Sequence, residues 1–244
     1  MTAGAQQTTQ PAAGQATAPG AFAVLELFTS EGCSSCPPAE ELLARIDKSA
    51  RQHDMPIYAL AFHVDYFDSL GWPDRFASAA FTGRQAAYVR LMRLPEVYTP
   101  QMVVNGRTQF VGSDVAAARR EIQAAFERSR DSTLLCRVRS DKKADKLLVD
   151  FRGAHMPNGA LACFALVEDG LETKVEAGEN RGRTLRHENV VRALTGVHPD
   201  QRWEGSIELS IPPGVRRDKA SVICFAQDPA TGEISAATRA TLPK

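Results

Sequence analysis

Residues 22–38 read FAVLELFTSEGCSSCPP, and this stretch decides the predicted fold. The apolar run at residues 22–28 is typical of a buried parallel strand. From Pro38 onward, apolar residues recur at the spacing of a helix; they are Ala39, Leu42, Leu43 and Ile46. Cys33 and Cys36 are therefore expected where a strand gives way to a helix.

The C-x-x-C spacing of Cys33 and Cys36 suits a reversible disulfide. Near a helix N-terminus, the helix dipole stabilises a thiolate, and thiol pKa values in such motifs fall to roughly 3.5–7.5 from about 8.5. Cys33 is therefore predicted to be the nucleophile and Cys36 the resolving thiol. The alternatives are half of a zinc site or two inert core cysteines. The sequence has no second C-x-x-C and no H-x-x-x-H to complete a tetrahedral zinc site.

A second informative segment, YTPQMVVNGRTQFVGSD, occupies residues 98–114. Residues 102–104 and 108–111 are predicted to be short strands, joined by a type I′ turn at Asn105-Gly106. A helix capped by Ser113 should follow.

Residues 22–130 resemble the thioredoxin-like superfamily, in which a Thr-Pro or similar dipeptide with a cis peptide bond faces the C-x-x-C pair. Thr99-Pro100 matches that position. The segments FTSEGC and NG followed by GSD resemble glutaredoxins. The whole chain is more similar to a poorly characterised family of secreted, two-domain thioredoxin-like proteins of unknown function. The motifs that carry this likeness are EGCSSCPP, HVDY, FTGRQ and YTPQ.

The resemblance implies that Pro100 holds an extended substrate chain beside Cys33, with the backbone of Thr99 as a strand-like partner. No Trp precedes Cys33, and the intervening dipeptide is Ser34-Ser35, so the direction of electron flow stays open. The long spacing between Cys36 and Pro100 indicates a helical insert at residues 63–94, similar in position to those of periplasmic thiol reductases.

The pattern changes beyond residue 130. Short apolar runs alternate with polar and Gly/Pro turns at a spacing typical of a β-sandwich; they are residues 134–139, 147–151, 161–167, 206–211, 221–226 and 234–241. The predicted fold class is an α/β thioredoxin-like domain followed by an all-β sandwich-like domain. The predicted division is a leader or linker at residues 1–20, a thioredoxin-like domain at 21–131 and a sandwich-like domain at 132–244.

Three further cysteines, Cys136, Cys163 and Cys224, lie in apolar strand runs of the second part. We expect them to be structural, buried and unreactive, because a free cysteine usually behaves as a small buried hydrophobe. Five cysteines leave at least one thiol unpaired within the chain. A bridge between Cys163 and Cys224 stays open.

Residues 178–192, GENRGRTLRHENVVR, are too polar for an ordinary core. One interpretation is a solvated loop and edge strand. The other is an arm that docks on the first domain or on a partner through arginine–carboxylate pairs; the arginines are Arg181, Arg183, Arg186 and Arg192.

Glu26, His63 and Asp65 are candidates for moving a proton or tuning a thiolate. Glu26 lies in an apolar strand, where a buried carboxylate with a raised pKa would take the proton of Cys36; the alternatives are an arginine pair and an exposed position. His63 and Asp65 end the second strand at the sheet edge where open α/β sheets place their sites. They are expected to tune a thiolate, to ligate a metal or to serve as hydrogen-bonded structure.

Composition limits the partners. The chain has 29 basic and 29 acidic residues among 244, which argues against an electrostatic nucleic-acid partner. No apolar run approaches the roughly 20 residues of a membrane span.

The first twenty residues carry no charge and read as a disordered leader or linker. They lack the basic and apolar regions of a signal peptide. Either a signal peptide has been removed or the protein is cytoplasmic with a flexible leader. The resemblance to a secreted family favours a periplasmic or secreted protein.

Together these features predict a thiol–disulfide oxidoreductase that acts on protein or small-thiol disulfides through Cys33 and Cys36 and exchanges electrons with an unidentified redox partner. No organic cofactor and no metal are expected. The alternative is a copper-binding or other metal-binding carrier with Cys33, Cys36 and His63 as ligands, since thiolates and imidazole suit Cu(I).

Overall fold

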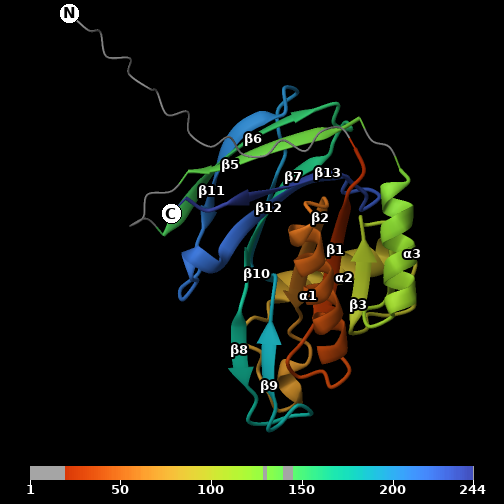
Figure 1. Ribbon diagram of the computed structural model, residues 1–244, viewed down its shortest axis with the longest axis vertical. Helices are drawn as coiled ribbons and strands as arrows, with labels where there is room; N and C mark the ends of the chain where they lie inside the picture. The colour runs from red at the N-terminus through yellow and green to blue at the C-terminus, as the bar shows by residue number, and fades with distance from the viewer. Residues whose placement is uncertain (1–19, 129–130, 140–144, 244) are drawn as a thin grey trace, which may run out of the picture.

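The computed structural model describes residues 20–128, 131–139 and 145–243 (Figure 1). The predicted leader at residues 1–20 therefore lies outside the described residues except for Gly20. The first half contains the strands β1 (Ala23–Thr29), β2 (Ile57–His63), β3 (Gln101–Val104) and β4 (Thr108–Val111). Its helices are α1 (Pro37–Gln52), α2 (Ala79–Leu91) and α3 (Val115–Phe126), with a short 3-10 turn, η1, at Asp68–Leu70.

The regular elements in the second half of the described chain are strands and one short 3-10 turn. They are β5 (Thr133–Arg139), β6 (Lys146–Ala154), β7 (Leu161–Glu168), β8 (Leu171–Lys174), β9 (Thr184–His187), β10 (Val190–Val197), β11 (Glu204–Ser210), η2 (Arg217–Lys219), β12 (Ala220–Gln227) and β13 (Ile234–Thr241). The six expected strands are present. Strands β8, β9 and most of β10 were not predicted, because β8 and β9 are short and polar and β10 lacks the regular apolar alternation that identifies a strand. No described helix is long and apolar enough to cross a membrane.

The β3–β4 hairpin confirms the turn prediction. Asn105 and Gly106 have φ angles of 49° and 65°, the left-handed values that a type I′ turn requires. The predicted cap of the following helix is wrong by one residue. Asp114, not Ser113, caps α3, and its carboxylate accepts a hydrogen bond from the backbone N–H of Ala117 at 2.9 Å.

The predicted fold class, an α/β thioredoxin-like domain followed by an all-β sandwich-like domain, is wrong. Within the described residues, strands from both halves form one mixed eight-stranded sheet in the order β13-β12-β7-β10-β2-β1-β3-β4. The two halves meet where Val190 of β10 pairs with Ala61 of β2, and the Ala61 N–H donates to the carbonyl of Asn189 at 2.8 Å. A smaller sheet, β11-β6-β5, covers one part of the large sheet, and β8 pairs with β9 alone.

The error has a physical reason. Alternation of apolar and polar residues indicates which faces of a strand are buried. It does not indicate which other strand pairs with that strand. Moreover, β7 and β12 are buried at every position after their first residue, as expected for strands covered on both faces rather than for half-exposed sandwich strands. The predicted domain boundary at residues 131–132 falls between α3 and β5 and stays a prediction about independent folding units.

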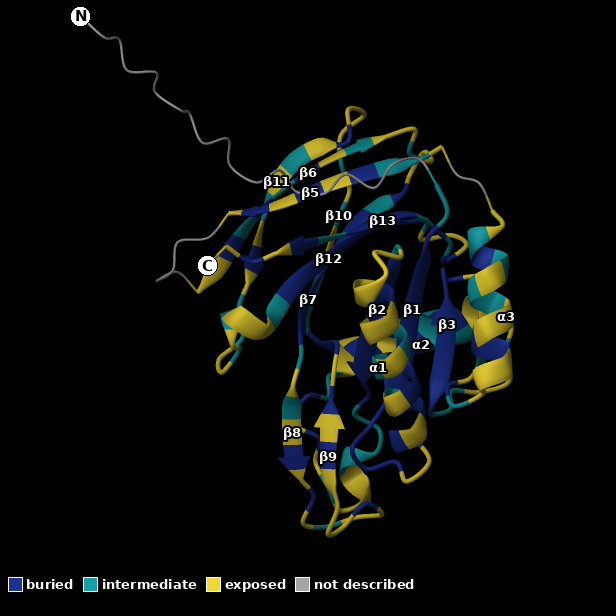
Figure 2. Ribbon diagram, viewed as in Figure 1, coloured by how far each residue is buried: buried dark blue, intermediate teal, exposed yellow. Residues whose placement is uncertain are grey.

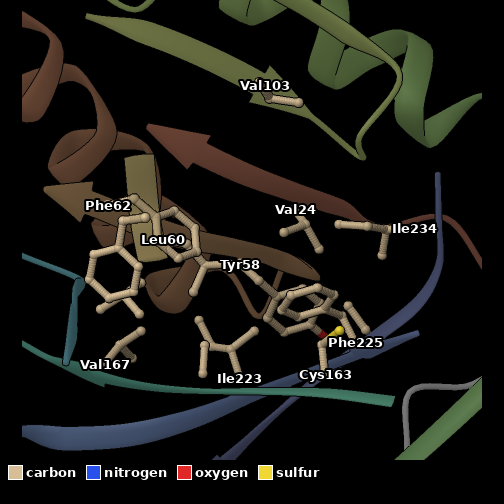
Figure 3. Packing of buried hydrophobic residues seen from close by; sticks show 14 of the residues in the cluster. Val24, Tyr58, Leu60, Phe62, Val103, Cys163, Val167, Ile223, Phe225 and Ile234 are labelled. Atoms are coloured by element: carbon tan, nitrogen blue, oxygen red, sulfur yellow. The ribbon is translucent and has the colours of Figure 1, made fainter. Parts of the chain in front are cut away.

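The core also joins the two halves. Figure 2 shows buried central strands and helices α1 and α3 with exposed outer faces. In Figure 3, aromatic and aliphatic side chains of β2 pack against those of β7 and β12; the labelled residues are Val24, Tyr58, Leu60, Phe62, Val103, Cys163, Val167, Ile223, Phe225 and Ile234. A second cluster of buried hydrophobic residues fills the space between the small sheet and the large one. A third such cluster lies beneath α1 and α3.

The three cysteines of the second half are buried, as predicted. Cys136 of β5 forms a disulfide with Cys224 of β12, whereas Cys163 is free. The Cys163–Cys224 bridge that the sequence left open is therefore not formed. Burial raises the pKa of the Cys163 thiol to about 11, which keeps this thiol protonated.

The β3–β4 turn touches the second half directly. The N–H of Ile234 donates to the carbonyl of Asn105 at 3.0 Å, and Arg107 pairs with Glu233 at 2.5 Å. A Cβ atom added to Gly106 would lie 1.8 Å from the carbonyl oxygen of Gly232. Glycine is required at this position both by its positive φ and by the close approach.

The substitution Gly106→Ala should therefore lower the free energy of unfolding by more than the cost of placing alanine at a positive φ. The control is Gly214→Ala, because Gly214 also has a positive φ, 79°, and a Cβ there would meet no atom within 4 Å. The control should lower the free energy of unfolding by about 1–2 kcal/mol. Gly106→Ala should lower it by a further 1–3 kcal/mol or so, the usual cost of forcing extra volume into a packed site. Urea unfolding of the oxidised protein measures both values, and equal losses would contradict the close packing of the two halves.

Candidate functional site

Cys33 and Cys36 form a disulfide at the N-terminus of α1. Their Cα atoms are 5.4 Å apart, and Cys36 is the N-cap residue, directly before Pro37. The carbonyl of Cys36 accepts the first helical hydrogen bonds, so the strand-to-helix placement predicted for the pair is confirmed. Both cysteines are buried, with exposed fractions of 2% and 0%, beneath the exposed residues Ser34 and Ser35.

The Thr99-Pro100 segment lies against this disulfide. Its peptide bond is cis, as predicted, and it precedes β3, which pairs with β1. The hydroxyl of Thr99 donates to the sulfur of Cys33 at 3.3 Å. The chain folding therefore brings together Cys33, Cys36, Thr99 and Pro100.

Glu26 is buried within β1 and is held by two residues of α2. Arg84 Nε donates to one carboxylate oxygen at 2.5 Å, and the Tyr88 hydroxyl donates to the other at 2.5 Å. Burial acts to lower the pKa of Arg84, but the charge of Glu26 outweighs it and raises that pKa. Of the interpretations that the sequence left open for Glu26, the arginine pair is the one observed. Both of its oxygens are engaged on the side of the sheet that α2 covers.

His63 and Asp65 do not pair with each other. His63 Nδ1 lies 2.6 Å from Oδ2 of Asp74, whereas Asp65 accepts a hydrogen bond from the Thr82 hydroxyl at 2.6 Å. Burial acts to raise the pKa of Asp74, but the charge and hydrogen bond of His63 hold it below its usual value. Asp65 thus fixes the first turn of α2, and His63 faces a buried polar cluster.

The β8–β9 arm, residues 171–187, reaches back to the cysteine loop. The side-chain amide of Asn180 donates to the carbonyls of Glu31 and Cys33 at 2.8 and 3.0 Å. The backbone N–H of Ser34 donates to the carboxylate of Glu179 at 2.9 Å. Figure 1 shows β8 and β9 projecting beside the end of α1 that carries the cysteines. The docking interpretation of residues 178–192 is confirmed, although Glu179 and Asn180, rather than the arginines, make these contacts.

His187, the last residue of β9, lies between two carboxylates of the cysteine region. Its Nδ1 is 2.6 Å from Glu40 of α1, and its Nε2 is 3.2 Å from Glu31. Burial acts to lower the pKa of His187, but the contacts with Glu31 and Glu40 outweigh it and raise that pKa to about 10. Thr29 also donates to Glu40, at 2.7 Å. The arm and α1 are thus joined by a buried ion pair.

One nitrogen or oxygen atom from each of Glu40, His63 and His187 lies within 4.8 Å of the others. Among the described residues, this is the group of three whose side chains are placed to share a metal ion, and it includes neither cysteine. We call these three residues the histidine–glutamate cluster.

Five residues of this region were not predicted as site residues from the sequence; they are Glu31, Glu40, Asp74, Asn180 and His187. Glu40 carried a weak signal, because it stands in the first helical turn, four residues after Cys36. His187 and Asn180 lay within the polar stretch that was singled out, but their partners are about 150 residues away in the chain.

Comparisons with known proteins came from both structure and sequence. A crystal structure of a protein from Agrobacterium tumefaciens is similar over 93% of this chain and 97% of that chain, with 27% identity and a TM-score of 0.69. HBP35 of Porphyromonas gingivalis shares the fold over 92% of this chain and 76% of that chain, with 14% identity and a TM-score of 0.65. A search of curated proteins found no match.

The family whose pattern matches is described as "Protein of unknown function (DUF1223)", and the match covers residues 24–227 of the 244-residue chain. Because this is well over half of its length, the chain belongs to the DUF1223 family.

Proposed function

We propose that the protein is a thiol–disulfide oxidoreductase that makes and breaks the Cys33–Cys36 disulfide on protein or small-thiol disulfides. The observation that carries the proposal is the position of the pair. Cys36 caps the N-terminus of α1, and the Thr99 hydroxyl donates to the sulfur of Cys33. A hydroxyl donor and the positive end of a helix both stabilise a thiolate at this place when the disulfide is reduced.

The reaction is a two-step thiol–disulfide exchange. In the reduced protein, the Cys33 thiolate attacks one sulfur of a substrate disulfide, and the other substrate sulfur leaves as a thiolate. The Cys36 thiolate then attacks Cys33 in the mixed disulfide and releases the second substrate thiol. One protein dithiol and one substrate disulfide thus become one protein disulfide and two substrate thiols. A dithiol redox partner restores the reduced protein, and the reverse sequence oxidises substrates.

The local motifs support this chemistry. The C-x-x-C pair and the Thr99-Pro100 segment resemble the active-site segments of thioredoxin-like proteins and glutaredoxins in sequence. This resemblance concerns the motifs and not the arrangement of the whole sheet. The similarity of the whole chain to a secreted family, rather than these motifs, favours a periplasmic or secreted location.

Access to the disulfide requires a small movement. Cys33 is 2% exposed, so a substrate sulfur reaches it only when the covering segments separate. The contact between Ser34 and Glu179 lies at the surface, where a hydrogen bond exchanges readily with water. We propose that the substrate enters here, between the cysteine loop and the β8–β9 arm.

The metal-carrier alternative, with Cys33, Cys36 and His63 as ligands, has less support. His63 is bound to Asp74, and the group of ligands to which it belongs contains no cysteine. The reduced Cys33–Cys36 pair would also be partly buried at the start of α1. Both thiolates would therefore have to reorient to bind one ion.

The roles of the two thiols can be separated by trapping. With a model protein disulfide, reduced Cys36→Ser should accumulate a mixed disulfide at Cys33, because no second thiol resolves it. Cys33→Ser should neither trap substrate nor turn it over. The control Cys163→Ser, at a buried free cysteine, should behave like the wild type. Non-reducing gels and mass spectrometry identify the adducts, and trapping by Cys33→Ser alone would reverse the assigned roles.

The Thr99 hydroxyl should also matter. Thr99→Val keeps the side-chain volume but removes the donor to Cys33. A hydrogen bond to a charged group is worth about 1.5–3 kcal/mol, and about half of this is recovered because a less stabilised thiolate is more nucleophilic, so the rate at which Cys33 attacks a small disulfide below the pKa of its thiol should fall roughly four- to fifteenfold. The control is Thr108→Val, at an exposed position of β4. Stopped-flow kinetics of the reduced proteins give the rates, and an unchanged rate for Thr99→Val would remove this residue from the site.

A further inference from the structure

We propose that Glu40, His63 and His187 bind one divalent transition-metal ion, of which Zn²⁺ fits best, and that this ion fastens the β8–β9 arm to β2 and α1. The inference goes beyond the redox function and does not depend on it. It also departs from the expectation, drawn from the sequence, that the protein holds no metal.

The three side chains come from separate elements. His63 ends β2, Glu40 lies in the first turn of α1, and His187 ends β9. One ligand atom from each lies within 4.8 Å of the others. Two imidazoles and a carboxylate form a ligand set that first-row transition metals prefer, and Zn²⁺ tolerates varied geometry because it has no preference from d electrons.

His63 is oriented as a metal ligand usually is. Its Nδ1 is fixed by the carboxylate of Asp74 at 2.6 Å. Its other nitrogen, Nε2, is fully buried and has no hydrogen-bond partner. A carboxylate on one ring nitrogen holds the imidazole in place and makes the other nitrogen a better donor to a metal. A buried ring nitrogen without a partner is otherwise costly, whether or not it carries a proton.

His187 has a carboxylate beside each of its ring nitrogens. Its Nε2 lies 3.2 Å from the carboxylate of Glu31, at ion-pair distance but without the alignment of a hydrogen bond. Its Nδ1 lies 2.6 Å from Glu40. Glu31 would therefore act on His187 as Asp74 acts on His63, and Nδ1 would face the ion together with Glu40.

The charges of the region also favour a cation. The carboxylates of Glu31 and Asp74 are 0% exposed and that of Glu40 is 10% exposed, and their ion pairs within the described chain are with His63 and His187 alone. With His187 protonated and His63 neutral, two of the three negative charges therefore stay uncompensated. Burying unpaired charge is expensive, and a divalent ion in place of the His187 proton would leave one.

Binding would require a modest contraction. Zinc-to-ligand distances of about 2.0–2.2 Å place the ligand atoms of a tetrahedral site roughly 3.3–3.6 Å apart. The ion would replace the hydrogen between His187 Nδ1 and Glu40, and that proton would leave to solvent. A water molecule would complete the four ligands. Because His63 and His187 are 0% and 1% exposed, the site is closed and suits a structural ion rather than a transported one.

The test uses the full chain, without an affinity tag, stripped of metal and kept oxidised. In this state Cys33 and Cys36 have no thiolate to offer. Titration with Zn²⁺ against a chromophoric competitor should give one site per chain. Zinc-edge X-ray absorption of the loaded protein should give nitrogen and oxygen neighbours at about 2.0–2.2 Å, including imidazole, and no sulfur.

Two variants and two controls locate the site. His63→Gln and His187→Gln should each weaken Zn²⁺ binding by at least about 100-fold. His53→Gln and His198→Gln change exposed histidines and should leave binding unchanged. Near-UV circular dichroism checks that each variant is folded.

Three results would overturn the proposal. The first is that the folded, oxidised wild type binds no stoichiometric zinc. The second is that sulfur is found among the zinc neighbours, and the third is that the wild type and both cluster variants bind zinc with equal affinity. The absorption spectrum of the wild type decides the outcome even if a cluster variant fails to fold. If the protein exchanges thiols with disulfides but binds no zinc, the zinc proposal fails and the proposed redox function is unaffected.

Discussion

The pairing of Val190 with Ala61 is the contact on which the rest of the structure depends. It places β10 against the outer edge of β2 and joins two runs of strands into one sheet. Asn189, just before this pair, has a positive φ of 57°, and its side-chain oxygen accepts a hydrogen bond from Arg51 of α1. Because β9 ends at His187, this junction carries His187 to the cysteine end of α1. Without it, the β8–β9 arm would be held at the cysteine loop only by the contacts of Glu179, Asn180 and His187.

The surroundings of the cysteine loop are polar yet buried. Glu31 and Glu40 flank Cys33 and Cys36 in the chain, and both meet His187. Breaking one member of a buried charged group costs far more than breaking an exposed pair, because it leaves an uncompensated charge. The arm is therefore fixed at His187 and at the buried amide of Asn180, and is lightly held at Glu179, near the surface. The proposed redox site would thus have a rigid base, and the contact between Ser34 and Glu179 would be the first part of its cover to separate.

Local features of the sequence predicted local features of the structure. The strand before Cys33, the helix after Cys36 and the Asn105-Gly106 turn follow from short-range periodicity and backbone preferences. The cis bond before Pro100 was implied by a family resemblance. The sheet order was not predictable, because the edge of β2 pairs with a strand about 130 residues away, and the polar run before β10 gave no sign of pairing. The histidine–glutamate cluster was missed for the same reason, since His63 and His187 share no local motif.

The central claim is that the Cys33–Cys36 disulfide is reversible in the native protein. The most direct measurement is its equilibrium with defined ratios of reduced and oxidised glutathione, followed by alkylation and mass spectrometry. The buried Cys136–Cys224 disulfide serves as an internal reference. We expect the Cys33–Cys36 pair to be reduced within the range that glutathione reaches, above about −300 mV, while the folded protein keeps its reference disulfide. A Cys33–Cys36 pair that stays oxidised at every ratio until the protein unfolds would be structural and would contradict the account.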